Sequence, residues 1–166
     1  EIARGFTRKD LTMCGIAGCF GIQDEKTVNR MLDALPHRGP DDRGVHTYNN
    51  TVFGHTRLSI VDVAKGHQPI LANNGRTGII CNCEISNLQG RRDKLILKYE
   101  FNTKSDTETI LHLYQDVGPE CVKQLDGMFA FAIFNGDDFM LARDPIGIKP
   151  LYYGHIGDKL YFTSEL

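Results

Sequence analysis

Hydrophobic and polar positions alternate at both ends of the chain and predict strands there. In residues 14–21, Ile16, Gly18 and Phe20 alternate with other small residues, which is typical of a strand packed closely on its neighbour. Residues 128–134 are hydrophobic throughout and predict a strand buried on both faces. Other hydrophobic runs next to turn-forming residues predict strands at 45–48, 51–60, 70–71, 77–83, 139–142, 151–153 and 160–162.

Helical spacing is found in fewer places. Residues 27–35 carry hydrophobic side chains at helical spacing, and residues 87–99 predict a second helix with Asn87 as its cap. Ser105 and Glu108 have the spacing of a capping box in front of a third hydrophobic stripe. Because the helices are grouped and do not alternate with strands, the pattern predicts an α+β fold with largely antiparallel sheets.

Composition excludes several classes of function. The formal net charge is −2 and no basic run occurs, so the sequence gives no electrostatic reason to expect a nucleic-acid or membrane partner. No apolar stretch approaches the ~18 residues of a membrane span, and residues 1–13 lack the apolar core of a signal peptide. The five cysteines are therefore expected to be reduced thiols of a cytoplasmic protein.

The tripeptide Met13-Cys14-Gly15 is the first candidate for chemistry. A cysteine that becomes the first residue of a chain carries both a thiol and an α-amine with a pKa of ~7.7–8.0, which suits a general base. One residue then supplies the nucleophile and the base. The simpler interpretation is a small core residue in a glycine-rich strand.

Several longer segments follow one another along the chain and together cover Cys14 to Leu166. They are CGIAGCFG (14–21), HRGPDDRG (37–44), GHTRLSIVD (54–62), NCEISN (82–87), SDTETILHLY (105–114), LDGMFAFAIF (125–134) and ARDPIGIKPLYYG (142–154). In kind, order and spacing they resemble the glutaminase domain of glutamine-dependent asparagine synthetases, which are class II (N-terminal-nucleophile, Ntn) amidotransferases. HRGPDD and RLSIVD resemble this branch more than the phosphoribosyl- or hexosephosphate-directed amidotransferases.

The resemblance implies a fold and a division of the chain. The expected fold is the Ntn-hydrolase four-layer αββα sandwich with two mostly antiparallel sheets. Residues 1–13 are expected to be a leader, tag or propeptide, and residues 14–166 a class II amidotransferase domain that is truncated at its C-terminal end. A synthetase domain follows in the family and is absent here.

The resemblance also implies an activity. The domain is expected to hydrolyse glutamine to glutamate and ammonia through a thioester, without a cofactor. In the family the ammonia passes to the synthetase domain, which uses ATP and Mg to make asparagine from aspartate. The implied partners are glutamine and that domain, and a homodimer is left open.

Site residues are carried over only where the motifs match. Cys14 corresponds to the nucleophile, while Asn82 and the main-chain N–H of Cys83 correspond to the oxyanion hole. Arg57 corresponds to the residue that binds the glutamine α-carboxylate, which suits a planar guanidinium, and Asp106 to the partner of the α-ammonium. The other pocket residues contribute main-chain groups and are Leu58, Val61 and Glu84.

These residues also have simpler interpretations. Arg57 alone would be a surface arginine on a strand, Asp106 an acid at a helix N-terminus, and Asn82 a turn residue. In the metal-binding alternative, Cys81 and Cys83 act as ligands with a histidine such as His37, His55 or His67, although one C-x-C is poor zinc spacing. A redox pair of Cys14 and Cys83 is a further alternative.

Three departures from the family pattern bear on activity. Residues before Cys14 hold its nitrogen in a peptide bond, so we expect little activity until they are removed. Cys83 stands where the family has Gly, so we expect impaired turnover. Ser86 stands where the family commonly has Tyr, and we expect it to weaken packing next to the site more than the chemistry. The competing hypothesis is a non-catalytic domain that keeps the fold and only binds.

Overall fold

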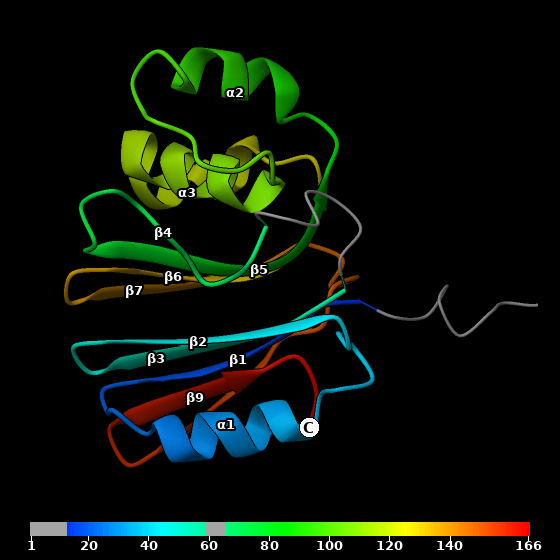
Figure 1. Cartoon of the computed structure of the whole chain (residues 1–166), viewed down its shortest axis with the longest axis vertical. Helices are drawn as coiled ribbons and strands as arrows, with labels where there is room; N and C mark the ends of the chain where they lie inside the picture. Colours follow the sequence, from blue (N-terminus) through cyan, green and yellow to red (C-terminus); the bar gives the residue numbers. More distant parts are fainter. Residues whose placement is uncertain (1–12, 59–65) are drawn as a thin grey trace, which may run out of the picture.

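Two antiparallel sheets lie face to face in the computed structural model, which describes residues 13–58 and 66–166 (Figure 1). The first sheet has the strand order β2-β3-β1-β9-β8. Its strands are β1 (Gly15–Phe20), β2 (Asp42–Tyr48), β3 (Thr51–Arg57), β8 (Tyr152–Ile156) and β9 (Lys159–Thr163). The second sheet has the order β4-β5-β6-β7. Its strands are β4 (Ile70–Leu71), β5 (Thr77–Ile85), β6 (Gly127–Asn135) and β7 (Asp138–Arg143).

Helices cover the outer face of each sheet. Helix α1 (Glu25–Asp33) packs on β1 and β3 of the first sheet. The second sheet is covered by α3 (Asp106–Val117), with α2 (Gln89–Leu95) packed on α3 and the 3₁₀ helix η2 (Gly118–Gln124) following it. The expected four-layer αββα sandwich with antiparallel sheets is therefore confirmed.

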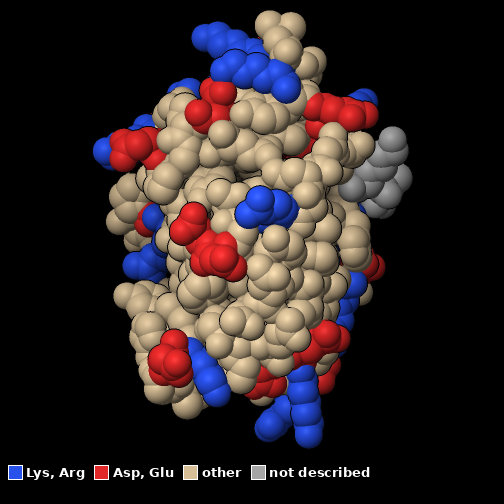
Figure 2. All heavy atoms as spheres, turned by 90° about the vertical axis from the view of Figure 1, so that its left-hand side faces the viewer, with Lys and Arg blue, Asp and Glu red and all other residues tan. Residues whose placement is uncertain are grey.

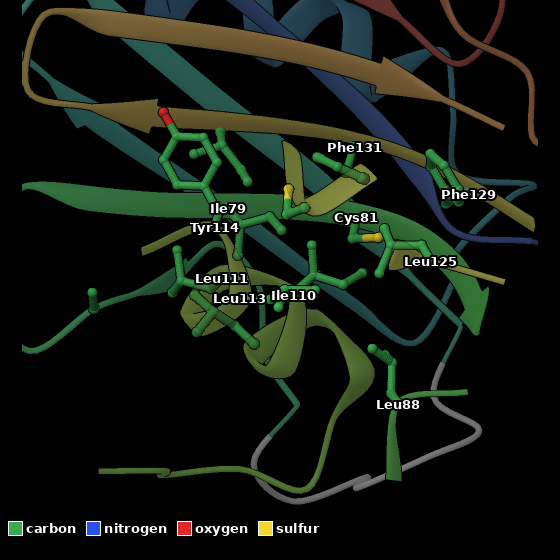
Figure 3. Packing of buried hydrophobic residues seen from close by; sticks show 14 of the residues in the cluster. Ile79, Cys81, Leu88, Ile110, Leu111, Leu113, Tyr114, Leu125, Phe129 and Phe131 are labelled. Carbon is green, nitrogen blue, oxygen red and sulfur yellow. The ribbon is translucent and has the colours of Figure 1, made fainter. Parts of the chain in front are cut away.

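Each interface between layers has its own apolar core. Ile110 and Leu111 of α3 pack with Ile79 of β5 and Phe131 of β6, as Figure 3 shows. Aromatic rings fill the space between the sheets, where Phe53 meets other rings edge to face. The side chains of α1 cover the small residues of β1. Because β6 lies between two of these cores, its central residues are buried on both faces, as the hydrophobic run predicts.

The hairpins form where the turn residues predict them. Asn49 has a φ of 46° between β2 and β3, and Gly136 has a φ of 63° between β6 and β7. Asparagine and glycine are the residues that best tolerate this left-handed region. The turn therefore fixes the register, and Asn135 lies opposite Asp138.

Helix α2 is shorter than the sequence predicts. It begins after Leu88, and Asn87 does not cap it, because the Asn87 side-chain oxygen accepts the Asp126 N–H while its amide donates to the Gln124 carbonyl and the Asp126 carboxylate. Leu97, which lies within the predicted range 87–99, is 85% exposed.

Only half of the predicted capping box is present at α3. The Ser105 hydroxyl accepts the Glu108 N–H, as expected for an N-cap. The buried Glu108 carboxylate instead accepts the N–H groups of Asn102 and Thr103 and the Thr103 hydroxyl, each at 2.7 Å. Glu108 therefore fixes the segment that leads into α3.

We predict that Glu108→Ala lowers the free energy of unfolding by about 2 kcal/mol, because it removes three hydrogen bonds to a buried charged carboxylate. Urea denaturation checks this value. The control is Glu120→Ala, since Glu120 is exposed and pairs with Lys123 at the surface, and it should cost no more than about 0.5 kcal/mol. Equal midpoints for the two variants would contradict the role given to Glu108.

Charged side chains are mixed on the face shown in Figure 2, where Lys and Arg lie among Asp and Glu. This face carries no continuous basic surface of the kind that binds nucleic acid. In the part of the chain that the structure describes, no helix has both the length and the hydropathy needed to cross a bilayer.

Candidate active site

A pocket of about 150 Å³ lies where the two sheets and α3 meet. The start of β1, the end of β3, the C-terminal half of β5 and the start of α3 supply its walls. Drug-sized ligands need about 300–1,000 Å³, so this pocket suits a smaller molecule. Its described lining residues are Met13, Cys14, Arg57, Leu58, Gly66, Gln68, Cys81, Asn82, Cys83, Glu84, Ser105, Asp106, Thr107 and Lys149.

The Cys14 thiol lies just before β1 and contacts the end of β3. The Leu58 N–H points at the Cys14 sulfur from 3.4 Å. Burial raises the pKa of the Cys14 thiol, although the Leu58 hydrogen bond and the charges of Arg57 and Lys149 oppose this rise. Cys14 is therefore a thiol at neutral pH in this form and requires a base to become a nucleophile.

Arg38 positions the main chain of Cys14. The buried guanidinium donates from Nε to the Cys14 carbonyl at 3.2 Å and pairs with Glu165 at 2.6 Å. Two residues further on, the Ile16 N–H donates to the Ser164 hydroxyl. The segment HRGPDDRG thus contributes a residue that fixes the site, although the sequence alone allowed it to be a plain loop.

Asn82 is a strand residue of β5 and not a turn residue, which corrects the simpler interpretation. Its side chain is buried in the pocket, and its Nδ2 has no hydrogen-bond partner among the described residues. An unpaired buried donor is costly, so it requires an explanation. A ligand oxygen bound in the pocket would supply the missing acceptor.

The exposed edge of β5 presents a row of main-chain N–H groups. The Cys81 N–H donates to the Gln68 side-chain oxygen at 2.6 Å, and the Ile85 N–H points at Asp106 Oδ2 at 3.4 Å. Cys83 lies between them and is opposite Phe129 of the neighbouring strand β6. The main-chain N–H and C=O of Phe129 pair with Asp144, on the side of β6 that faces away from β5. Because main-chain groups alternate in direction along a strand, the Cys83 N–H faces the pocket edge.

Cys81 and Cys83 form a disulfide across Asn82, with Cα atoms 5.7 Å apart. This corrects the expectation that all cysteines are reduced, and it leaves Cys14 as a free cysteine, so the alternative redox pair of Cys14 and Cys83 is not formed. Their common face agrees with the two-residue period of a strand. Cys83 also lacks the left-handed φ that would favour the family's glycine, since Asn49 is the only described non-glycine residue with a positive φ. Backbone strain at Cys83 is therefore no reason to expect impaired turnover.

Arg57 and Asp106 place opposite charges on the pocket wall. Arg57 is the buried last residue of β3, not a surface residue, and Asp106 is the first residue of α3. Burial raises the pKa of Asp106, while the Ile85 N–H and the charge of Arg92 act in the opposite direction. A guanidinium and a carboxylate in one small pocket complement the two charges of an amino acid.

The other expected pocket residues divide into two groups. Leu58 and Glu84 line the pocket. Val61 lies outside the described residues, as do residues 1–12 of the expected leader. Ser86 donates its hydroxyl to the Asp126 carbonyl and is not among the residues that line the pocket. Its departure from the family pattern therefore has no direct effect on the site.

Gln68 is a pocket residue that the sequence did not indicate. Its side-chain amide donates to the Cys81 carbonyl at 3.1 Å and accepts the Cys81 N–H, so it extends the pairing that β4 begins. His55 contacts the same carbonyl from the first sheet at 3.3 Å. Burial lowers the pKa of His55 to about 3, so this imidazole is neutral. Gln68 carries no sequence signal beyond its polarity, and His55 was singled out only within a longer motif and as a metal-ligand alternative.

Lys149 is a second addition to the site. The Asp144 carboxylate accepts the N–H groups of Phe129, Ile148 and Lys149, which fixes the loop after β7. Burial raises the pKa of Asp144, but these N–H groups outweigh it and hold the pKa below its usual value. The ordered loop directs the buried Lys149 side chain into the pocket.

The described residues contain no group of three or more His, Cys, Asp or Glu side chains that could hold a metal ion. Both sulfurs of the C-x-C pair are bonded to each other. His55, one of the histidines proposed with them, contacts the Cys81 carbonyl. The metal-binding alternative therefore has no ligand set in this part of the chain.

Comparison with known proteins identifies the family. The family model described as "Glutamine amidotransferase domain" matches residues 13–166. The chain belongs to this family. Two solved structures share the fold of this amidotransferase domain over 91% of the chain. One is the glutamine phosphoribosylpyrophosphate amidotransferase of B. subtilis, complexed with ADP and GMP, at 25% identity and a TM-score of 0.78. The other, described as the allosteric regulatory enzyme of purine biosynthesis, has 24% identity and a TM-score of 0.76, and shows the fold alone.

Curated relatives of the domain are longer proteins. Asparagine synthetase [glutamine-hydrolyzing] 1 of Bacillus subtilis is 44% identical in an alignment of 163 residues that covers 92% of this chain and 26% of that protein. Asparagine synthetase B [glutamine-hydrolyzing] of Escherichia coli is 42% identical over 93% of this chain and 29% of its own length. The chain thus spans between a quarter and a third of these relatives.

Proposed function

We propose that this domain hydrolyses glutamine to glutamate and ammonia. The observation that carries the proposal is the unpaired Asn82 amide in the same pocket as the Cys14 thiol. A donor that is buried without an acceptor, beside a candidate nucleophile, suits an oxygen that becomes negative during the reaction. The glutamine-hydrolysing relatives support the choice of substrate.

Substrate binding follows from the charges of the pocket. Arg57 binds the α-carboxylate of glutamine through two parallel hydrogen bonds, and Asp106 accepts from its α-ammonium. These two contacts recognise a free amino acid and leave its side chain directed at Cys14. Main-chain groups of Leu58 and Glu84, with those of Val61 as the resemblance implies, complete the pocket.

The chemistry needs a base close to the thiol. When Cys14 is the first residue, its α-amine takes the thiol proton, directly or through a water molecule, and the thiolate adds to the carboxamide carbon. The negative oxygen binds Asn82 Nδ2 and the Cys83 N–H. The tetrahedral intermediate then collapses, the proton passes to the departing nitrogen, and ammonia leaves. Water hydrolyses the γ-glutamyl thioester and restores the thiol.

The activity of the whole protein is a wider proposal. The named relatives support an asparagine synthetase, in which ammonia from this domain reacts in a synthetase domain. That domain would use ATP and Mg to convert aspartate to asparagine, and the glutaminase domain itself would need no cofactor. The same proposal includes a cytoplasmic location. It also includes a homodimer, which the sequence left open.

The direct test is the release of glutamate from glutamine by the chain that begins at Cys14. Glutamate formation that depends on glutamine and that iodoacetamide abolishes, by alkylating Cys14, is the expected result. Asparagine, which is one methylene shorter, should react much more slowly because its carboxamide does not reach the thiol. A correctly folded chain that binds glutamine without releasing glutamate would instead establish a non-catalytic domain.

We predict that Asp106→Asn raises KM for glutamine about 10- to 100-fold with a smaller change in kcat, because a hydrogen bond to a charged group contributes about 1.5–3 kcal/mol. Steady-state glutamate release measures both constants. Asp116→Asn is the matched control, since Asp116 lies on the same helix and pairs with Lys98 at the surface. An unchanged KM in Asp106→Asn would remove Asp106 from the binding site.

A further inference from the structure

Lys149 is a buried cation whose position the proposed chemistry leaves unexplained. Its side chain is 4% exposed, and its nearest carboxylate is that of Glu84 at 3.7 Å, on a side chain that is mostly in solvent. Burying an ammonium is costly when its partner is distant and hydrated. Such a group in a pocket is a candidate for function.

The lysine reaches the residues that surround the candidate nucleophile. Its Nζ lies 3.2 Å from the sulfur of Met13, the residue bonded to the nitrogen of Cys14. The ammonium therefore contacts the residue that directly precedes Cys14, and its charge acts on the Cys14 thiol. Lys149 and Cys14 line the same pocket.

The position of Lys149 is built into the fold. Its N–H donates to the Asp144 carboxylate at 3.0 Å, and the same carboxylate binds the Phe129 N–H of the central strand β6. The lysine is thus tied to the second sheet, whereas Cys14 precedes the first strand of the other sheet. The pocket brings the two together.

We propose that Lys149 is a positioning residue that acts through Cys14, because its fixed positive charge favours the thiolate of Cys14 and the neutral form of a Cys14 α-amine. This inference rests on the proposed function of the site. An ammonium stabilises a nearby anion and disfavours a protonated amine, so it favours the thiolate and keeps the α-amine in its free-base form at neutral pH. Arg57 contributes positive charge from β3, and Arg38 binds the Cys14 carbonyl.

Negative groups of the pocket act in the opposite direction. They are Glu84 of β5 and Asp106 of α3, both of which line the pocket. Asp144 binds the main chain of Lys149 within the same loop. The positive charge of Lys149 offsets part of the negative charge of these carboxylates near Cys14. Without it, we expect the thiol to lose its proton only at higher pH.

The test measures the pH dependence of Cys14 alkylation by iodoacetamide in the full chain, followed by mass spectrometry of the peptide that contains Cys14. In Lys149→Met the midpoint should rise by about 0.5 to 1 pH unit, so that alkylation at neutral pH slows by about three- to tenfold. In Lys149→Arg, which keeps the positive charge, the midpoint should equal that of the unmodified chain. Lys94→Met, which removes an exposed lysine from α2, should leave it unchanged.

A midpoint in Lys149→Met within 0.2 pH units of the unmodified chain would overturn the inference. If Lys149→Met does not fold, Lys149→Gln gives the same comparison, since it keeps a polar head and removes only the charge. Alkylation needs no turnover, so this result stands even if the chain proves unable to hydrolyse glutamine.

An activity measurement then adds a second readout. In the chain that begins at Cys14, Lys149→Met should move the acid limb of kcat/KM to higher pH by a similar amount. A purely structural role would lower kcat/KM at every pH without moving the limb, and that outcome would also overturn the inference.

Discussion

A chain whose first residue is Cys14 should release glutamate from glutamine, and the same chain with residues 1–13 attached should do so about 10³-fold more slowly. Burial raises the pKa of the Cys14 thiol, so attack requires a general base, and a well-placed base contributes about 10²- to 10⁴-fold. A peptide nitrogen cannot accept a proton, whereas an α-amine with a pKa of ~7.7–8.0 can.

Met13 adds a second obstacle in the longer chain. It lines the pocket and its sulfur contacts Lys149, so the residue occupies space beside the thiol. The measurement is glutamate release by both chains, with the intact mass of each sample determined in parallel. Because residual processing would generate active chains, the mass spectrum is needed to interpret the rate.

Two variants separate chemistry from folding in this experiment. Cys14→Ala in the chain that begins at this position should abolish release while the thermal unfolding curve stays in place. Cys19→Ala changes a buried cysteine of β1, the strand that follows Cys14, and should retain activity, although it loses some stability. Equal rates for the two chain lengths would show that the α-amine is not the base.

The sheets could be predicted from the sequence because their signals are local. An asparagine or glycine in a tight turn fixes a hairpin, and the hydrophobic run around Phe131 predicts burial of both faces of β6. Helix α2 was overestimated because hydrophobic spacing alone does not show whether a surface exists to cover it. Leu97 lies within the predicted range 87–99 but remains in solvent.

Parts of the site depend on distant contacts and could not be predicted in this way. The pocket positions of Cys14, Arg57, Asn82 and Asp106 agree with the family resemblance, which identified them from motifs. Lys149 is directed into the pocket by hydrogen bonds from three N–H groups to Asp144, and one of these groups lies in β6. Such an arrangement has no local signature.

The pairing of Cys81 with Cys83 shows a different limit. A two-residue period places both on one face, but it does not distinguish two thiols from a disulfide. The expectation of reduced thiols rested on the redox conditions of the cellular compartment and not on the positions of the two cysteines. The bonded pair flanks Asn82 along the chain, but its sulfurs lie on the opposite face of β5 from the Asn82 side chain.

Replacing Asn82 with alanine should lower kcat for glutamine about 10²- to 10³-fold and leave KM within a few-fold of its original value. Removing one oxyanion-hole donor costs about 2.7–4 kcal/mol in the transition state, because the donor acts where charge develops and contributes little in the ground state. The unpaired Nδ2 gives a second expectation. Because Nδ2 has no acceptor among the described residues, Asn82→Ala removes an unpaired buried donor, and we expect it to lower the free energy of unfolding less than an apolar truncation of the same size.

Steady-state glutamate release and urea denaturation of the same samples check both parts of this prediction. Asn135→Ala is a suitable control, because Asn135 ends the neighbouring strand β6 at a hairpin and binds Thr77, outside the pocket. That variant should keep kcat and lose only stability. If Asn82→Ala instead raised KM and kept kcat, the amide would be a ground-state binding group. The oxyanion would then depend on the Cys83 N–H, which no side-chain substitution at position 83 other than proline removes.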